Sequence, residues 1–398
     1  MEVKSRIACL VLITFIFILA LNSSVIANDT NTDTITAKAY ILMDADSGKI
    51  LKAKNEHMQL PPASMTKLMT LVLALEAMKN GKVNKNDQVV SSQHAYEMDG
   101  TQLYLEPGEV MSFDDMLMGM ALSSANDASV AVAEHLAGSE DKFITQMNQK
   151  ASDLGMKDTH FKNANGLPAK NHYSSAYDMA VLARYALAHS SITDYTSVKQ
   201  YQLYHRKLKN SNKLLWWYQG ADGLKTGYTT EAQHCLAATA KRDGLRLITV
   251  VMFCTQKDGH FKDTIELLDY GFNHYSCKSL LAKGYVCGTT KVIGGVTDNI
   301  KVVTGTEVTS IYVKGQEKKL RSQIKLNSEI KAPVKQGQKL GEIAIYNDHD
   351  LIKKVDAVAA RAVLRSSSIG QIGHSHLGYG LIILLLLAAT YYYRKRLN

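Results

Sequence analysis

Hydrophobic periodicity changes twice along the chain, and this change limits the possible folds more than any other feature. Residues 39–43 and 222–254 contain short runs of apolar and β-branched residues, typical of strands. The stretch from Val90 to about Ser197 has helical spacing, a cap at Ser112 and a stop at Gly138. If the early and late strands share one sheet, the helices are inserted between them. We therefore predict an α+β fold: an antiparallel sheet flanked by helices, with an inserted helical cluster.

The composition changes again near residue 276. Residues 277–365 are rich in Val, Thr, Lys and Gly with alternating polarity, which predicts a second, small all-β domain. The first domain is expected to span residues 36–275. A serine-rich linker is expected at residues 366–376, after the second domain.

The N-terminus has the pattern of a secretory signal peptide at residues 1–27. Lys4 and Arg6 precede an apolar stretch, and small residues end at Ala27, where cleavage is expected. An uncleaved anchor helix is the alternative, but a typical span needs about 20 apolar residues and this stretch is shorter.

The C-terminus has the pattern of a transmembrane helix at residues 377–393, followed by a basic cytoplasmic tail at 394–398. No polar face interrupts the apolar stretch, which argues against a helix that lies on the membrane surface. Because basic residues favour the cytoplasmic side, we predict a single-pass protein of the cell membrane with its folded part on the extracytoplasmic face.

Charge and cysteine content exclude two classes of function. The formal net charge is +9, but part of it lies in the two terminal segments, and no basic stripe with interleaved aromatics predicts nucleic-acid binding. The cysteines after the signal lack the close paired spacing of a zinc site, so no metal or cofactor is expected. Disulfides and buried thiols both remain open for these four residues, which are Cys235, Cys254, Cys277 and Cys287.

Three short motifs carry the candidate chemistry. They are Ser64-Met65-Thr66-Lys67, Ser124-Ala125-Asn126 and Lys225-Thr226-Gly227, in this order. Each motif alone is a weak signal, because such short patterns occur by chance. All three in order in a secreted chain are a strong signal for a serine nucleophile.

The spacing of the first motif has a physical reason. Ser64 and Lys67 are three residues apart at the start of a predicted helix, which brings hydroxyl and amine to one face. A lysine can act as the base for a serine if burial or a nearby positive charge, such as Lys225, lowers its pKa. The alternative interpretation is an N-cap serine and a solvated lysine.

Together the motifs resemble those of the low-molecular-weight D-alanyl-D-alanine carboxypeptidases, penicillin-binding proteins of peptidase family S11. The resemblance covers Lys38 to Arg365 and includes residues 161–167 and 172–178, which we interpret as scaffolding. Within the latter, Ser174 or Ser175 is expected to cap a helix. One departure is Gln233, where the family pattern leads us to expect glycine in the turn after Thr229.

The resemblance implies three catalytic side chains. Ser64 would be the nucleophile, Lys67 its base, and Ser124 a proton relay towards the leaving group. Asn126 would hold the amide carbonyl of the substrate.

The third motif and its neighbours would bind the rest of the substrate. Lys225 and Thr226 would bind the terminal carboxylate, and Gly227 would let the substrate backbone lie close to the strand. The oxyanion hole would consist of the backbone N–H groups of Ser64 and Tyr228.

The implied function is removal of the terminal D-alanine from peptidoglycan stem peptides that end in D-Ala-D-Ala, with β-lactam antibiotics as covalent inhibitors. A class A β-lactamase is one alternative, but it needs a glutamate for deacylation, and no glutamate occurs between Glu140 and Glu231. A catalytically silent wall-binding protein is the other alternative, although every catalytic position is filled.

Overall fold

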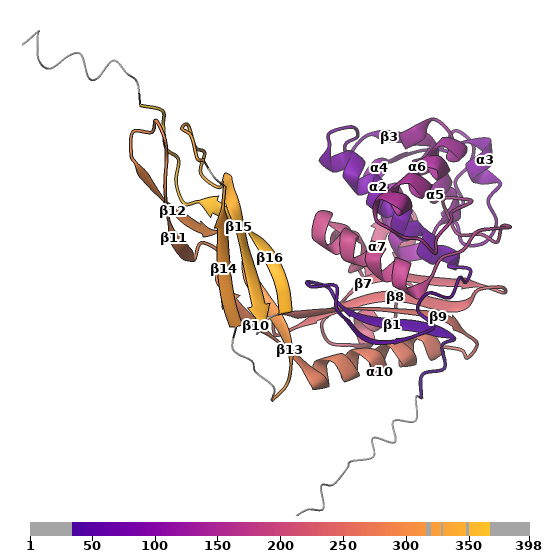
Figure 1. Ribbon diagram of the computed structural model, residues 1–398. Helices are drawn as coiled ribbons and strands as arrows, with labels where there is room; N and C mark the ends of the chain where they lie inside the picture. Colours follow the sequence, from indigo (N-terminus) through magenta and orange to yellow (C-terminus); the bar gives the residue numbers. More distant parts are fainter. Residues whose placement is uncertain (1–33, 316–319, 328, 348–349, 367–398) are drawn as a thin grey trace, which may run out of the picture. The chain divides into compact units, whose positions relative to one another are not determined.

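The computed structural model describes residues 34–315, 320–327, 329–347 and 350–366. Its first domain is built on a five-stranded antiparallel sheet with the strand order β2-β1-β9-β8-β7 (Figure 1). Two strands precede the helices in the chain and three follow them, as the sequence predicts. The strands are β1 (Ala39–Asp44), β2 (Ile50–Lys54), β7 (Ala221–Thr229), β8 (Gln233–Arg242) and β9 (Leu245–Cys254).

Helices cover both faces of this sheet, so its central strands are buried on both sides. Figure 1 shows α10 (Gly259–His274) along one face and the inserted helices on the other. The inserted elements are η1 (Ala63–Thr66), α2 (Lys67–Lys79), α3 (Gln93–Tyr96), α4 (Phe113–Met118), η2 (Gly119–Ser123), α5 (Asn126–Ala137), α6 (Glu140–Asp153), α7 (Ala176–His189), α8 (Ile192–Thr196) and α9 (Leu214–Trp217).

The predicted helix ends agree with the structure. The Ser112 hydroxyl accepts the Asp115 N–H at 3.1 Å and caps α4. The Ser175 hydroxyl accepts the Asp178 N–H at 3.1 Å and caps α7, as expected for one of the two serines there. Gly138 ends α5 with a φ of +81°, a left-handed conformation that glycine adopts without steric cost.

Two small ribbons interrupt the helical region, and the sequence did not predict them. β3 (Gln88–Val90) pairs with β4 (Val110–Ser112), and β5 (Gln200–Leu203) pairs with β6 (Arg206–Lys209). Each strand has only three or four residues, too few for a period of two to stand out from a helical pattern.

The second domain contains only strands among its described residues, in agreement with the predicted all-β domain. Its five-stranded sheet has the order β11-β12-β16-β15-β14, and β10 pairs separately with β13. The domain has its own apolar core, which includes Ile300, Val302 and Ile343. The strands are β10 (Tyr275–Leu281), β11 (Val286–Lys291), β12 (Asn299–Thr304), β13 (Val308–Val313), β14 (Leu320–Leu326), β15 (Lys339–Asn347) and β16 (Asp350–Ala359).

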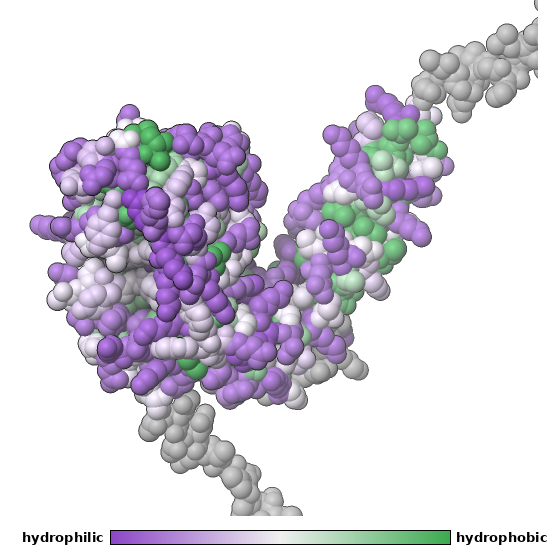
Figure 2. All heavy atoms as spheres, turned by 180° about the vertical axis from the view of Figure 1, so that it is seen from behind, coloured by the Kyte–Doolittle hydropathy of each residue, from purple (hydrophilic) through white to green (hydrophobic). Residues whose placement is uncertain are grey.

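The two domains present different surfaces. Figure 2 shows a mostly hydrophilic face on the first domain and larger apolar patches on the β domain. Val296 and Leu364 are among the exposed apolar side chains of the β domain.

The predicted signal peptide and transmembrane helix lie outside the described residues. Among the residues that are described, no helix is both long and apolar enough to span a membrane. All four cysteines of this part are free thiols: Cys235 and Cys254 are buried, and Cys277 and Cys287 are partly exposed.

Candidate active site

Ser64 lies in a short 3-10 turn that leads directly into α2. The peptide bond between Ala63 and Ser64 is enclosed by two glycines. A Cβ atom on Gly166 would lie 2.0 Å from the Ala63 carbonyl oxygen, and one on Gly227 would lie 3.1 Å from the Ser64 nitrogen. A side chain at position 166 would have to displace backbone atoms, and one at position 227 would press on its neighbours, so the two glycines allow close packing around the turn that carries the candidate nucleophile.

Gly227 also has a packing role that the sequence did not predict. The resemblance implied only that its missing side chain lets the substrate backbone lie close to the strand, and this stays a prediction. The close neighbours of its Cβ position are the Pro62 carbonyl oxygen at 3.0 Å, the Ala63 side chain and the Ser64 nitrogen. Gly227 thus allows strand β7 to approach the turn that carries Ser64.

Lys67 is fully buried, and its amine has three partners. Nζ lies 3.1 Å from Ser64 Oγ, 2.6 Å from Asn126 Oδ1 and 2.6 Å from the Asn165 carbonyl oxygen. The last two atoms can only accept hydrogen bonds. A neutral amine that donates to both directs its lone pair at the Ser64 hydroxyl, which is the orientation that a base requires.

Burial and charge both favour the neutral form of this amine. Desolvation lowers the pKa of Lys67 well below its usual value, and the nearby positive charge of Lys225 lowers it further, whereas Asp127 acts in the opposite direction. Lys225 is itself almost fully buried, and burial lowers its pKa to about 7. The electrostatic influence of Lys225 agrees with the expectation from sequence.

The second motif lies where η2 turns into α5. Ser124 adopts a left-handed φ of +62°, and its carbonyl accepts a hydrogen bond from Thr101 Oγ1 at 2.9 Å. Asn126 donates from Nδ2 to the Asp99 carbonyl at 2.6 Å while its Oδ1 contacts Lys67. Among the described residues, the Ser124 hydroxyl has no hydrogen bond to Ser64 or Lys67. The loop that contains Asp99 and Thr101 therefore stabilises the second motif through these two hydrogen bonds.

The third motif lies on β7, an edge strand of the sheet. Side chains alternate along it: Lys225 and Gly227 are buried, Thr226 is partly exposed, and Tyr228 is 57% exposed. Thr226 Oγ1 lies 2.7 Å from Ser211 Oγ. An edge strand leaves backbone groups unpaired, so this one can pair with an extended peptide.

Asn165 contributes a contact that the scaffolding interpretation missed, because it binds Lys67 through its backbone carbonyl. Two side-chain amides shape this loop: Asn163 Oδ1 accepts the Gly166 N–H at 2.7 Å, and Asn165 Oδ1 accepts the Leu167 N–H at 2.9 Å. Such turns are a common use of Asn, so the sequence signal was the Asn-x-Asn-Gly pattern.

His172 forms hydrogen bonds with both the loop of residues 161–172 and the turn that carries Ser64. The Lys162 N–H donates to Nδ1 at 3.1 Å, so the ring proton lies on Nε2 and donates to Thr66 Oγ1 at 2.9 Å. Burial lowers the pKa of His172 to about 4, so the ring is neutral at physiological pH. His172 thus ties the loop of residues 161–172 to the turn that carries Ser64.

Asp127 was also missed by sequence reasoning. Its carboxylate is fully buried and accepts the backbone N–H groups of Leu103 and Leu105 at 3.0 and 3.1 Å. An acidic residue in the first turn of a helix is an ordinary signal, which gave no reason to single it out.

The turn after β7 has the backbone conformation for which the family pattern predicts glycine at position 233. This residue has a φ of +55°, a left-handed conformation that favours glycine. Its Nε2 donates to the Thr230 carbonyl at 2.6 Å, a contact that glycine would lack.

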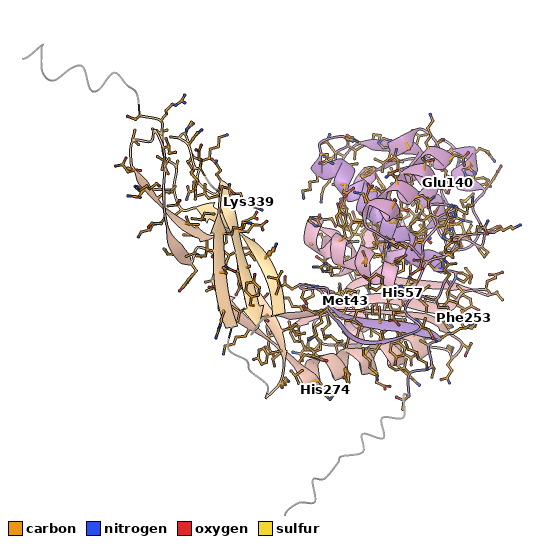
Figure 3. All side chains as sticks on the ribbon, viewed as in Figure 1. Met43, His57, Glu140, Phe253, His274 and Lys339 are labelled. Atoms are coloured by element: carbon orange, nitrogen blue, oxygen red, sulfur yellow. The ribbon has the colours of Figure 1, made fainter. Side chains whose placement is uncertain are left out.

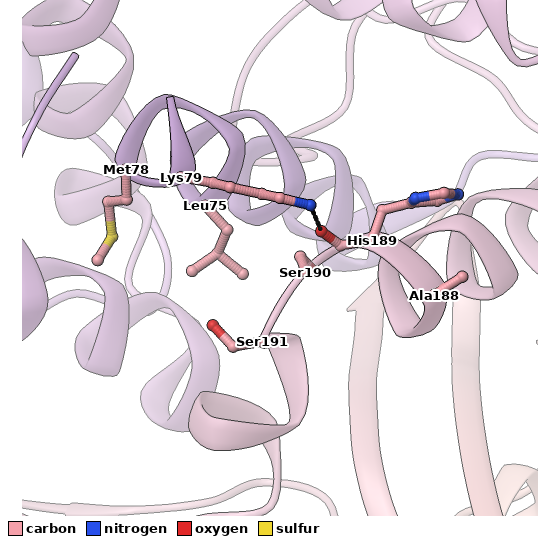
Figure 4. A pocket seen from close by; sticks show the side chains of 7 residues that line it. All are labelled: Leu75, Met78, Lys79, Ala188, His189, Ser190 and Ser191. Carbon is pink, nitrogen blue, oxygen red and sulfur yellow. Dashed lines mark hydrogen bonds between the residues drawn. The ribbon is translucent and has the colours of Figure 1, made fainter. Parts of the chain in front are cut away.

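A separate pocket lies at the far end of α2. It is lined by Met78, Lys79 and His189 among others, and Lys79 Nζ already donates to the His189 carbonyl at 3.1 Å (Figure 4). None of its lining residues belongs to the three motifs, so it is not the candidate active site.

The fold and the serine–lysine contact define a penicillin-recognising enzyme of the serine acyl-transfer class. A family model described as D-alanyl-D-alanine carboxypeptidase, Peptidase_S11, matches residues 26–255, and one for the C-terminal domain of penicillin-binding protein 5 matches residues 275–365. The chain therefore belongs to the family of D-alanyl-D-alanine carboxypeptidases.

Named relatives agree with this assignment. The chain is 40% identical to D-alanyl-D-alanine carboxypeptidase DacF of Bacillus subtilis over 83% of its own length and 86% of the relative. It is 33% identical to DacA of Escherichia coli, over 87% and 90% of the two chains. The crystal structure of penicillin-binding protein 5 from Haemophilus influenzae has a TM-score of 0.68 at 31% identity, covering 83% of this chain and 98% of the other.

Proposed function

We propose that the protein removes D-alanine from stem peptides through an acyl-enzyme on Ser64. Ser64 Oγ attacks the carbonyl of the penultimate D-alanine while Lys67 takes the hydroxyl proton. The C–N bond then breaks, and the departing D-alanine receives a proton through Ser124. Water hydrolyses the ester and releases the shortened peptide. The observation that carries this proposal is the buried Lys67 amine, 3.1 Å from Ser64 Oγ and held by two acceptors.

We assign substrate binding to further residues of the three motifs and to Tyr228. Lys225 and Thr226 bind the terminal carboxylate, and the second Nδ2 hydrogen of Asn126 holds the amide carbonyl of the substrate. The N–H groups of Ser64 and Tyr228 stabilise the oxyanion. The burial of Lys225 supports this role, because the attraction between its charged form and a carboxylate is less screened away from bulk water.

β-Lactams are the expected covalent inhibitors, since they present an acyl group to the same serine. A related penicillin-binding protein, D2 of Listeria monocytogenes, has been crystallised in an ampicillin-bound form, at 33% identity to this chain over 60% of its length. Efficient β-lactamase action is not favoured. Glu140 lies in the helical cluster (Figure 3), where its carboxylate accepts the Ala164 N–H at 2.8 Å and contacts His94 at 2.8 Å.

The site of action is proposed from the sequence alone. A cleaved signal peptide at residues 1–27 and a membrane helix at 377–393 would hold the enzyme on the extracytoplasmic face of the cell membrane. This location gives access to the cell wall.

The test is a comparison of the wild type with Ser64→Ala. The wild type should release D-alanine from a peptide ending in D-Ala-D-Ala and should be labelled by a fluorescent penicillin. Ser64→Ala should lose both, with a rate at least about a thousandfold lower, because the nucleophile is gone. Its thermal unfolding should be nearly unchanged, since the Ser64 side chain caps no helix. Residual labelling of the variant would identify another residue as the nucleophile.

A further inference from the structure

A pocket of about 340 Å³ lies beside the candidate nucleophile. Its wall includes Pro62, Ala63 and Gly166, which belong to or contact the turn that carries Ser64. Thr229 at the end of β7 also lines it. The pocket therefore adjoins the proposed acyl-transfer site, yet none of the proposed catalytic side chains lines it.

The position of the pocket along β7 indicates which part of the substrate it faces. The terminal carboxylate is assigned to Lys225 and Thr226, and the scissile carbonyl to the N–H of Tyr228, further along the strand. An extended peptide advances about 3.3 Å per residue, at the same pace as the strand that it pairs with. The residue before D-Ala-D-Ala is thus directed towards Thr229 and Glu231, at this pocket.

The lining combines an apolar wall with two opposite charges. Leu167 and Pro168 supply part of the wall, and Lys170 and Glu231 supply the charges. Both charged side chains are exposed, and neither forms an ion pair with any residue in the described part of the chain. An unpaired positive and an unpaired negative group in one pocket match a ligand that carries both charges.

We propose that this pocket binds the side chain of the stem residue that precedes D-Ala-D-Ala, and that it selects a side chain ending in both an ammonium and a carboxylate. Glu231 contacts the ammonium and Lys170 the carboxylate. A side chain with an amine alone gains the attraction of Glu231 but meets repulsion from Lys170. This inference rests on the proposed carboxypeptidase function and adds the substrate preference of the same site.

The experiment compares three peptides ending in D-Ala-D-Ala. Their preceding residue is diaminopimelate, lysine with a free amine, or lysine with an acetylated amine. We expect kcat/KM of the full enzyme to be highest for diaminopimelate. Lys170→Met should lower the ratio of kcat/KM for the diaminopimelate peptide to kcat/KM for the lysine peptide about fivefold, a size typical of one partly screened ion pair. Glu231→Gln should lower the ratio of lysine to acetyl-lysine by a similar factor.

Two controls separate a charge effect from a structural one. Lys157→Met removes an exposed lysine outside the pocket and should leave both ratios at the wild-type values. High salt should reduce the wild-type preference, because screening weakens exposed ion pairs.

The outcomes are distinct. Unchanged ratios in both pocket variants, with all peptides cleaved, would overturn the pocket assignment and leave the carboxypeptidase function intact. Failure to cleave any of the three peptides, together with no penicillin labelling, would instead contradict the proposed function.

Discussion

Two buried lysines with opposite requirements lie at the centre of the site. As the proposed base, Lys67 must be neutral, whereas Lys225 must be charged to bind a carboxylate. Burial lowers the pKa of both amines, and the charge on Lys225 adds to the effect on Lys67. The active form of the free enzyme is therefore the singly protonated pair, with the proton on Lys225.

This pairing predicts a bell-shaped pH dependence of kcat/KM. Activity falls at acid pH as Lys67 is protonated, and it falls at alkaline pH as Lys225, with a pKa of about 7, loses its charge. Lys225→Arg should move the alkaline limb to higher pH, because a guanidinium does not titrate in this range. The measurement is kcat/KM for one D-Ala-D-Ala peptide between pH 5 and about 10.

The profile of kcat provides the internal control. Bound carboxylate stabilises the charged form of Lys225, so the alkaline limb of kcat should lie above that of kcat/KM in the wild type. An alkaline limb in Lys225→Arg that coincides with the wild type would assign that limb to another group.

Sequence reasoning found the side chains of the site but not its backbone contacts. The motifs single out Ser64, Lys67 and Asn126 in the sequence, and the Lys67 amine contacts both of the other side chains in the structure. The Asn165 carbonyl could not be predicted in the same way, because every residue has a carbonyl and only the tertiary fold directs one at Lys67. The proposed role of Ser124 stays a prediction, since its hydroxyl has no contact with the Ser64–Lys67 pair.

At the level of elements, the site depends on how closely β7 and the loop at Gly166 approach the turn that carries Ser64. Gly166 has a φ of +89°, and its Cβ position lies 2.0 Å from the Ala63 carbonyl oxygen. A side chain there would have to displace backbone atoms, which cannot rotate away as a flexible side chain can. The turn is thus positioned by contacts from two elements distant in sequence.

Gly166→Ala should therefore lower the free energy of unfolding by more than about 2 kcal/mol and strongly reduce penicillin labelling. Thermal unfolding and the labelling rate measure the two effects. Gly155→Ala is the matched control, because Gly155 also has a positive φ, of +72°, but has no atom within 4 Å of its Cβ position. It should cost only about 1 kcal/mol and leave labelling intact. Equal effects of the two variants would mean that backbone strain alone, and not contact with Ala63, makes glycine necessary.

The sequence predicted elements best where local signals agree with the tertiary fold. The sheet strands and the caps at Ser112, Ser175 and Gly138 belong to this group. The ribbons β3–β4 and β5–β6 were missed because their strands are too short to show alternation. Gln233 adopts a glycine-like φ where β8 begins to pair with β7, against its own conformational preference.

At the scale of the whole molecule, the three motifs lie in the first domain, and the β domain has a core of its own. Because the two cores are separate, the chemistry and the proposed attachment to the membrane can be tested on separate parts of the chain. The apolar patches on the β domain are relevant to this division, because such patches can mark contact surfaces (Figure 2).

Removal of the chain after Ser366 tests the division directly. The truncated enzyme lacks the predicted membrane helix and keeps both described domains. We expect it to be soluble and to cleave short peptides ending in D-Ala-D-Ala with nearly wild-type kcat/KM. On intact cells it should lose activity against wall peptides near the membrane, because tethering raises the local concentration of the enzyme there. Sedimentation with membranes in high salt and release of D-alanine measure the two properties. If the truncated enzyme still sedimented with membranes, the exposed apolar residues of the β domain, such as Val296 and Leu364, would have to provide the affinity.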